Sequence, residues 1–479
     1  MARAGSLAGS GADGATVVRA RRRGAAKSQA APLLSWAREH DRPRTRPADP
    51  LRVTGLFAGV GGIELGLHRA GHCTLLMCES DPGAAAVLRA RFPSVPIHDD
   101  VRALNELPER TTLLAAGFPC QDLSQAGMTR GIGGARSGLV GEVFRLLEVH
   151  SVPWVLLENV PFMLQLAGGR ALDVIVRRLE TLGYRWAHRV VDSRAFGLPQ
   201  RRERVFLLAS KVGDPRDVLL TDDAGEPDEP AFRRGAAHGF YWTEGVRGLG
   251  WAVDAVPTLK GGSTIGIASP PAILLPDGRI VKPDLRDAER MQGFEVDWTK
   301  PAEAVVKPGM RWKMVGNAVT VDVAAWIGER LRTPGEYKGL WDHPLPPGAP
   351  WPRAAWNVGD GRFTADVSAW PKRVRRTPLH RFLQFEAVPL SVRGTEGFLK
   401  RARSGRLRFP EGFLEAVAAH LKRMRETEAD GADSRADEVR AARAHAANEA
   451  SAPRAKRTAR TATLASQAAK HRRPHAPRH

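Results

Sequence analysis

The stretch that decides the fold is Arg52-Val53-Thr54-Gly55-Leu56-Phe57-Ala58-Gly59-Val60-Gly61-Gly62. Its first six residues predict a β-strand, its glycines predict a turn, and Ile63 to Ala70 predicts a short helix after that turn. Glycines at such a turn let a ligand approach the backbone closely, and the helix N-terminus offers free amide donors. Glycine turns are common in proteins, so this stretch indicates a ligand site only together with the residues that follow it.

Strands and helices alternate from this stretch to about residue 210. The further predicted strands are Thr74 to Glu79, Leu113 to Ala116, Trp154 to Glu158 and Arg204 to Ala209. The clearest predicted helices are Pro82 to Phe92, Leu139 to His150 and Ala171 to Leu182. Alternation of this kind predicts an α/β fold, with a mostly parallel sheet that helices cover on both faces. Beyond residue 210 the chain is loop-rich, and helical periodicity returns at Ala318 to Leu331.

Two acidic residues follow the glycine turn at positions that suit a nucleotide. Glu79 ends the second strand, about twenty residues after the turn, where a ribose hydroxyl is usually held. Asp100, in His98-Asp99-Asp100-Val101, follows the next element and could bind an adenine amino group. The turn and the two acids together predict a cofactor that contains adenosine.

Cys120 is the candidate nucleophile. It lies in Gly117-Phe118-Pro119-Cys120-Gln121, directly after the apolar run that ends at Ala116. A thiol at a strand end, on a turn shaped by proline, is placed for nucleophilic chemistry. A lone cysteine is more often a small core residue, so packing is the alternative for Cys120 taken alone.

Charged residues stand at two more strand ends. Glu158 closes the strand that begins at Trp154, and Gln200-Arg201-Arg202-Glu203-Arg204 leads into another strand. Ligands gather at the carboxyl edge of open α/β sheets, so a glutamate near a nucleophilic cysteine could bind a ring nitrogen there. The guanidinium groups could hold a carbonyl oxygen or a phosphate.

The composition favours a polyanionic partner and a reducing compartment. The 479 residues include 72 Lys and Arg against 52 Asp and Glu, a formal charge of +20, which favours nucleic acid. A genome rich in arginine and alanine codons would give the same balance. With Cys73, Cys78 and Cys120 as the only cysteines, there is no disulfide framework and no four-cysteine zinc site, and no metal is predicted. There is no apolar run of about 18 residues and no secretory signal, so we expect a cytoplasmic protein without a membrane span.

Six segments in sequence order resemble the motifs of cytosine-5 DNA methyltransferases, between about residues 52 and 330. They are Phe57-Ala58-Gly59-Val60-Gly61-Gly62, Gly117-Phe118-Pro119-Cys120-Gln121, Glu158-Asn159-Val160, Gln200-x-Arg202-x-Arg204, Arg290-Met291-Gln292-Gly293-Phe294 and Gly316-Asn317-Ala318-Val319. Met291 stands where the family usually has leucine. The resemblance implies a Rossmann-like methyltransferase sheet, a small loop-rich target-recognition lobe, S-adenosylmethionine as the methyl donor and double-stranded DNA as the substrate.

The resemblance also assigns roles to residues. Those that it assigns to catalysis are Cys120, Glu158, Arg202 and Arg204. Those that it assigns to the cofactor are Phe57, Gly59, Gly61, Gly62, Glu79, Asp100, Pro119 and Asn317. Gln121, Ser124 and Arg136, in or beside a glycine-rich loop that could close over DNA, are assigned to DNA binding. The target cytosine would have to be flipped out of the duplex to reach such a site.

The chain divides by composition into six parts. We expect a flexible basic arm (1–48), a catalytic domain (49–210), a target-recognition region (211–285), the rest of the catalytic domain (286–335), an accessory lobe (336–426) and a basic tail (427–479). The tail could contact phosphates or only aid solubility. Family members generally act as monomers, and a separately encoded restriction endonuclease is a possible partner.

Three alternatives use the same residues. A tRNA cytosine-5 methyltransferase would share the motifs, but the target segment and the basic ends suit a long duplex better. A catalytically silent DNA-binding regulator would have no need of Cys120, Glu158 and Arg204 together. A nicotinamide oxidoreductase would share the glycine turn and the acid, but would leave Cys120 and Glu158 unexplained.

Overall fold

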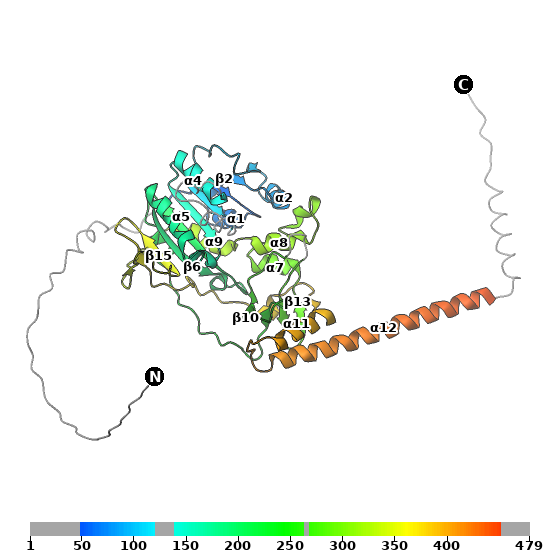
Figure 1. Cartoon of the computed structure of the whole chain (residues 1–479). Coiled ribbons are helices and arrows are strands. Elements are labelled where there is room, and N and C mark those ends of the chain that lie inside the picture. Colours follow the sequence, from blue (N-terminus) through cyan, green and yellow to red (C-terminus); the bar gives the residue numbers. More distant parts are fainter. Residues whose placement is uncertain (1–47, 120–137, 263–267, 452–479) are drawn as a thin grey trace, which may run out of the picture. The chain divides into compact units, whose positions relative to one another are not determined.

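A computed structural model describes residues 48–119, 138–262 and 268–451 (Figure 1). Within the last range, only the backbone is described for residues 431–436 and 444–451. Cys120, Gln121, Ser124 and Arg136 lie outside the described residues, as do nearly all of the predicted basic arm and the end of the predicted tail. No helix in the described ranges is both long and apolar enough to cross a membrane.

A ten-stranded mixed sheet forms the centre of the fold, in the order β14-β16-β15-β6-β8-β5-β4-β1-β2-β3. The strands of its parallel half are β1 (Arg52–Leu56), β2 (Cys73–Cys78), β3 (Ile97–His98), β4 (Leu113–Gly117) and β5 (Trp154–Asn159). The strands that join by antiparallel pairing are β6 (Arg185–Asp192), β8 (Glu203–Ser210), β14 (His343–Pro344), β15 (Ala354–Asn357) and β16 (Phe363–Thr364). The parallel half has the strand order β3-β2-β1-β4-β5, in which successive strands are added first on one side of β1 and then on the other, as in a Rossmann-like sheet.

The prediction of an α/β sheet is confirmed, but "mostly parallel" was wrong for half of it. The sequence pattern gave no signal for β6, because this strand buries His188 and Arg189 completely and so lacks an apolar run. Arg189 is tolerated there because it donates to the carbonyls of Leu219 and Asp222 and to the Asp223 carboxylate. Strands β14 to β16 are too short to show a periodicity.

Helices cover both faces of the sheet, as predicted. On one face, α4 (Leu139–Val149) and α5 (Arg170–Thr181) pack against the strands through a large apolar cluster. On the other face, α1 (Gly62–Arg69), α6 (Arg216–Leu219) and α9 (Val321–Arg332) do the same. Helix α2 (Pro82–Arg91) joins a third cluster with Met314 of α8 (Met310–Asn317). The strand ends are thereby fixed, and the loops that follow them meet at one edge of the sheet.

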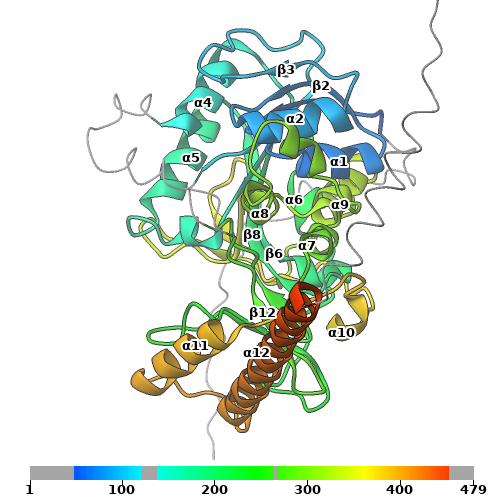
Figure 2. The same ribbon diagram turned by 90° about the vertical axis from the view of Figure 1, so that its right-hand side faces the viewer.

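A second sheet of five short antiparallel strands forms a smaller lobe. Its strands, in order, are β10 (Trp251–Val253), β9 (His238–Phe240), β12 (Ala272–Leu274), β13 (Ile280–Lys282) and β17 (Val388–Pro389). Helices α11 (Val392–Ser404) and α12 (Phe413–Ser451) pack together against this sheet (Figure 2). A separate two-stranded sheet pairs β7 (Gln200–Arg201) with β11 (Val256–Pro257), and α7 (Leu285–Met291), α10 (Leu379–Phe382) and several 3-10 turns complete the described elements.

The predicted division into domains remains a prediction, but the course of the chain bears on two of its parts. Residues 336–426 are shared between the sheets, because β14 to β16 extend the main sheet while β17 and α11 belong to the second. Helix α12 continues to Ser451, into the segment predicted as a tail. Beyond its packed first turns the described side chains are exposed, from residue 425 to 430 and from 437 to 443, as expected of a sequence without a hydrophobic face.

Candidate active site

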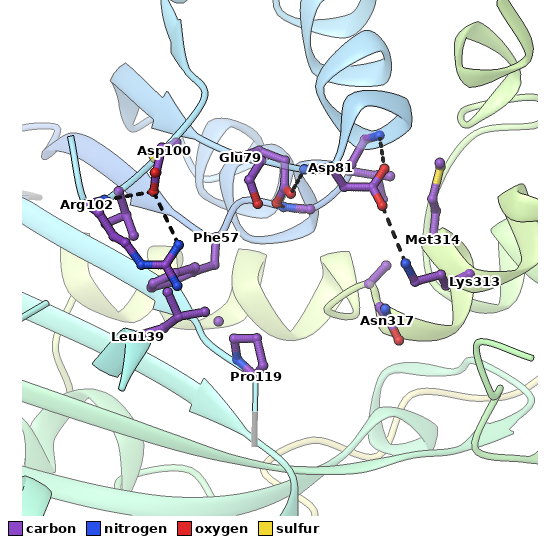
Figure 3. Close-up of a pocket in the computed structure, with 18 residues that line it drawn as sticks. Phe57, Glu79, Asp81, Asp100, Arg102, Pro119, Leu139, Lys313, Met314 and Asn317 are labelled. Atoms are coloured by element: carbon purple, nitrogen blue, oxygen red, sulfur yellow. Dashed lines mark hydrogen bonds and ion pairs between the residues drawn. The ribbon is translucent and has the colours of Figure 1, made fainter. Parts of the chain in front are cut away.

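A cavity of about 500 Å³ lies at the carboxyl edge of the main sheet (Figure 3). It is formed where the connections after β1 and β4 diverge, which is where open α/β sheets bind their ligands. The loops after β1, β2, β3 and β4 provide most of its wall, and α8 closes the other side. Six of the eight residues predicted to bind the cofactor line this cavity: Phe57, Gly59, Glu79, Asp100, Pro119 and Asn317.

Glu79 is fixed in the cavity wall by main-chain groups. The Gly59 N–H donates to its Oε2 atom and the Asp81 N–H to its Oε1 atom, each at 2.7 Å. Each carboxylate oxygen can still accept one more hydrogen bond, so a ribose diol can be held. Burial raises the pKa of the Glu79 carboxyl, although these two amide donors act in the opposite direction.

The backbone that lines the cavity is left-handed at two positions. Phe57 has a φ of 55° and Gly59 a φ of 57°, both in the left-handed region. For an aromatic residue such as Phe57 this conformation is uncommon and strained, and strain of this kind gathers at functional sites. A Cβ on Gly59 would meet no atom within 4 Å, which fits an open approach to the backbone at this point.

Gly61 and Gly62 do not line the cavity, although both were predicted to bind the cofactor. Gly61 has a φ of 83°, and a Cβ there would lie 2.6 Å from the Phe92 ring. A Cβ on Gly62 would lie 2.3 Å from the Val319 carbonyl oxygen. These two glycines allow α1 to pack against the end of α2 and against the segment Gly316 to Val319, which brings the first and last motifs into contact.

Glu158 and Arg204 form an ion pair at the ends of neighbouring strands. The Arg204 Nε atom lies 3.2 Å from the Glu158 Oε1 atom, and both side chains are largely buried. Burial raises the pKa of the Glu158 carboxyl, and the positive charges of Arg204 and Arg202 partly offset this effect. A Cβ on Gly117 would lie 3.4 Å from the Glu158 Oε2 atom, so the strand that leads to Cys120 runs directly beside this carboxyl group.

Arg202 is buried and holds the last motif in place. Its Nη1 atom donates to the Gly316 carbonyl at 3.1 Å and its Nη2 atom to the Ala318 carbonyl at 2.6 Å. Burial lowers the pKa of this guanidinium, and the neighbouring Arg204 lowers it further. Arg202 therefore connects the strand that carries Arg204 to the segment that ends with Asn317 in the cavity wall.

Comparison with known proteins assigns the family. Residues 51–230 match the C-5 cytosine-specific DNA methylase family. The Type II methyltransferase M2.BsuMI of Bacillus subtilis is 48% identical over 380 residues, which cover 77% of this chain and 97% of that protein. The chain belongs to this family. Members of the family methylate carbon 5 of cytosine in DNA, so the resemblance to cytosine-5 DNA methyltransferases is confirmed.

More distant relatives are of the same kind. The Type II methyltransferase M.PspPI of a Psychrobacter species is 29% identical to the methylase over 347 residues, which cover 62% of this chain and 82% of that protein. Among solved structures, the Dnmt2 methyltransferase of S. pombe matches with a TM-score of 0.43 at 15% identity, over 59% of this chain and 98% of that one. The family assignment depends on the sequence relatives and not on this structure.

The methylase uses two polar residues for which the sequence suggested no role. Asn159 follows Glu158, and its Nδ2 atom donates to the Phe118 carbonyl at 2.9 Å while its Oδ1 atom accepts from the Val160 N–H. It thus holds the main chain two residues before Cys120. Its position directly beside an acid at a strand end was the one available signal.

Gln292 is the second of these residues, and it joins three motifs through a buried network. Its Nε2 atom donates to the Val315 carbonyl at 2.7 Å. Its Oε1 atom accepts from Gln200 and from Thr320, each at 3.1 Å. Its place in one of the six motifs was the available signal, and its complete burial in the structure explains the network, since buried polar groups are normally hydrogen-bonded. The late motifs of the methylase are therefore one connected unit beside the cavity.

Proposed function

We propose that this protein transfers a methyl group from S-adenosylmethionine to carbon 5 of a flipped-out cytosine in a short double-stranded DNA sequence. The observation that supports the proposal most strongly is that a cavity suited to a cofactor and a polar site suited to a base lie at the same edge of the main sheet. The cavity lined by Glu79 and Asp100 suits an adenosine, and the Glu158–Arg204 pair beside Gly117 suits a pyrimidine. Pro119, which lines the cavity, directly precedes Cys120 in the chain.

The cavity residues fit S-adenosylmethionine by their chemistry. The Glu79 carboxylate suits the two ribose hydroxyls, and the Asp100 carboxylate suits the amino group of adenine. The main chain at Gly59 and the Asn317 side chain provide polar groups for the rest of the molecule. When bound, this cofactor supplies the methyl group, and the residues of the chain orient it and prepare the base.

The base site suits covalent activation of cytosine by Cys120. Carbon 5 is a poor nucleophile while the ring is aromatic. A bond from the Cys120 sulfur to carbon 6 would move the electron pair of the 5,6 double bond onto carbon 5, which then takes the methyl group. Loss of the carbon 5 proton and departure of the thiolate restore the ring. Glu158 would hydrogen-bond to ring nitrogen 3 and the exocyclic amine, and Arg204 to the carbonyl oxygen, with Arg202 in support.

The raised pKa of Glu158 supports its part in this reaction. A carboxyl group that retains its proton more readily than usual can donate a hydrogen bond to ring nitrogen 3, where negative charge develops when the thiolate adds. The other oxygen of the Glu158 carboxyl group can accept a hydrogen bond from the exocyclic amine. The ion pair with Arg204 fixes the orientation of the carboxyl group, so that it can meet the edge of the ring.

The biological setting is inferred from the relatives. Those named above are Type II methyltransferases, so we propose that this protein methylates DNA as part of a restriction-modification system or as an orphan enzyme. In the first case a separately encoded endonuclease would cut the same sequence. We propose that the enzyme is a cytoplasmic monomer, as is general in the family.

The test is bisulfite sequencing of host DNA after expression of the wild type, of Cys120→Ser and of Cys73→Ser. The wild type should protect cytosines within one short sequence, and Cys120→Ser should protect none. Cys73 is exposed at the start of β2, so Cys73→Ser is the matched control and should methylate normally. Methylation that survives in Cys120→Ser would contradict the covalent mechanism, and absence of methylation in the wild type would contradict the function.

A further inference from the structure

Positive charge is concentrated on α11 and on the loop that follows it. Residues 392–410 contain six Lys or Arg and a single acid, Glu396. Glu396 already has a partner, because its Oε1 atom lies 2.9 Å from the Nη2 atom of Arg425 in α12. Helix α12 itself contains more Asp and Glu than Lys and Arg. A genome rich in arginine codons would spread its cations over both helices, so the composition of the chain does not explain this concentration.

Five of these cations are exposed, and we call them the basic stripe: Arg393, Lys400, Arg403, Arg406 and Arg408. Among the residues that the structure describes, none offers the five side chains a hydrogen bond or an ion pair. The first three are seven and three residues apart, so they share one face of α11. The opposite face is buried against the lobe through apolar side chains. Packing of α11 therefore fixes which side the stripe presents to the solvent.

The last turn of α11 packs against the loop that follows β9. The guanidinium group of Arg401 donates to the carbonyls of Trp242 and Glu244, at 2.6 and 3.3 Å. A Cβ on Gly405, directly after α11, would lie 2.9 Å from the carbonyl oxygen of Gly245. The end of α11 and this loop are therefore in close contact, and the stripe residues around Gly405 lie beside the loop.

The same loop is connected to the base site through Lys260. The side chain of Glu244 forms an ion pair with Lys260. The next residue, Gly261, packs against the last motif, since a Cβ on Gly316 would lie 2.5 Å from the Gly261 nitrogen. The Gly316 carbonyl in turn accepts from Arg202 of the base site. A continuous series of contacts thus joins the end of the basic stripe to the base site.

We propose that the basic stripe binds the phosphate backbone of duplex DNA on one side of the sequence that contains the target cytosine. The inference rests on the proposed function, which brings a duplex to the base site. Cations without a protein partner can bind phosphates without first breaking an ion pair. From Arg393 to Arg403 the helix rises about 15 Å, which matches about four base pairs of DNA. Such contacts hold a protein on DNA and read no sequence.

The alternative is that the stripe is only a solvated surface of the lobe. The two explanations differ in the salt dependence of DNA binding. Each phosphate contact releases counterions, so the logarithm of the affinity falls with the logarithm of the salt concentration, with a slope of about 0.9 per contact. A solvated surface adds no contact and leaves this slope unchanged.

The experiment measures the affinity of the full chain for a duplex of random sequence, about 30 base pairs long, by fluorescence anisotropy at several salt concentrations. The stripe variant combines Lys400→Gln, Arg403→Gln and Arg406→Gln. It should bind the duplex about tenfold more weakly at low salt, and its salt slope should be smaller by about 3. In methylation of plasmid DNA, the variant should have a KM for DNA raised about tenfold and an unchanged kcat, because the stripe does not line the cavity.

Three arginines at the opposite edge of the main sheet provide the matched control. Arg52 and Arg185 begin β1 and β6, and Arg110 lies just before β4, so all three lie away from the carboxyl edge. Their joint replacement by glutamine removes the same charge as the stripe variant. The control variant should keep the salt slope of the wild type. Both variants should keep the melting temperature and the affinity for S-adenosylhomocysteine.

The outcomes separate this proposal from the proposed function. A stripe variant with the salt slope of the wild type, or an equal loss in the control variant, would overturn the DNA contact and leave methyl transfer to the bisulfite test. A parallel titration uses poly-glutamate as a model of an acidic protein. Unchanged DNA binding with lost poly-glutamate binding would assign the stripe to an acidic protein and overturn the proposal. Failure of the wild type to bind duplex DNA at any salt concentration would contradict the proposed function itself.

Discussion

The carboxyl edge of the main sheet and the lobe around the second sheet are held by different kinds of interaction. At the edge, Glu158 and Arg202 are buried and Glu79 is half-buried, and these side chains are held by hydrogen bonds with the main chain or by the ion pair with Arg204. In the lobe, Phe240 and Phe398 pack with ring centroids 5.1 Å apart against the start of α12. Polar side chains with backbone and ion-pair partners therefore gather beside the cavity, whereas apolar packing holds the lobe together.

The largest expected effect is that of Glu158→Gln, which removes the charge and the proton at the base site. The rate of methylation should fall about a hundredfold to ten-thousandfold, the range for a lost general acid. Binding of S-adenosylhomocysteine and the melting temperature should change little, because the amide keeps the size of the carboxyl group. Single-turnover kinetics measures the rate, and calorimetry measures the cofactor affinity and the melting temperature. A fall in cofactor affinity as large as the fall in rate would show that the two sites are not separable.

Phe398→Ala tests whether the packing of the lobe can be weakened without an effect on cofactor binding. Phe398 is fully buried between the second sheet and α12, so its loss should destabilise the protein by about 3 to 5 kcal/mol. Affinity for S-adenosylhomocysteine should remain at temperatures where the variant is folded. Denaturant unfolding checks the first statement, with the exposed Phe162→Ala as the control that should cost little. Loss of cofactor affinity in the folded variant would contradict the division of tasks.

A buried acid beneath the glycine turn gives a pH-dependent prediction for the edge. Burial raises the pKa of Glu64, which is 1% exposed, to about 7, and the charge of Glu79 adds to this effect. Between pH 4.5, its ordinary pKa, and pH 7, the unfolded chain has released this proton while the native state retains it. Stability should therefore fall as the pH rises through this window, by about 3 kcal/mol in total.

Glu64→Gln should remove this part of the pH dependence. The variant should gain stability relative to the wild type as the pH rises from 5 to 8, and the two should be closest at low pH. Urea unfolding of both proteins at each pH measures the difference. A constant difference across the range would mean that Glu64 does not titrate in the native state.

The smallest of these effects is expected for Asn159→Ala. The variant leaves the Phe118 carbonyl without its side-chain donor, which should cost about 1 kcal/mol. The rate of methylation should fall by about tenfold, because the main chain before Cys120 loses a fixed point, while affinity for S-adenosylhomocysteine is unchanged. An unchanged rate would show that Cys120 is positioned by other contacts.

More of the edge of the main sheet than of the lobe could be predicted from the sequence. Glu79 and Asp100 could be placed because each follows a strand in the chain, and neighbouring parallel strands end at the same edge. The packing of Gly61 and Gly62 against Phe92 and Val319 could not be predicted. A glycine that is required for close packing cannot be told apart, in the sequence, from a glycine that is required for ligand binding. Lys313, which lines the cavity beside Asp81, was not singled out because the two residues meet only through the folding of distant segments.

The sequence of the lobe contains few patterns from which its structure could be predicted. Its strands have two or three residues each, too few to show an alternation of apolar and polar positions. Trp242 and Trp251 of the lobe donate their ring N–H groups to the carbonyls of Pro270 and Ala231 and so stabilise loops. The helices that complete the lobe come from beyond residue 390, far along the chain from β9.

The central claim is that Cys120 attacks carbon 6 of cytosine at the edge that also holds the cofactor. The most direct measurement uses duplex DNA in which cytosine is replaced by 5-fluorocytosine, since fluorine at carbon 5 cannot leave as a proton and the adduct persists. After incubation with S-adenosylmethionine, mass spectrometry should find the nucleotide bound to the peptide that contains Cys120, and no adduct should form with Cys120→Ser. An adduct on another residue, or methyl transfer to ordinary DNA without any adduct on the fluorinated duplex, would contradict the account.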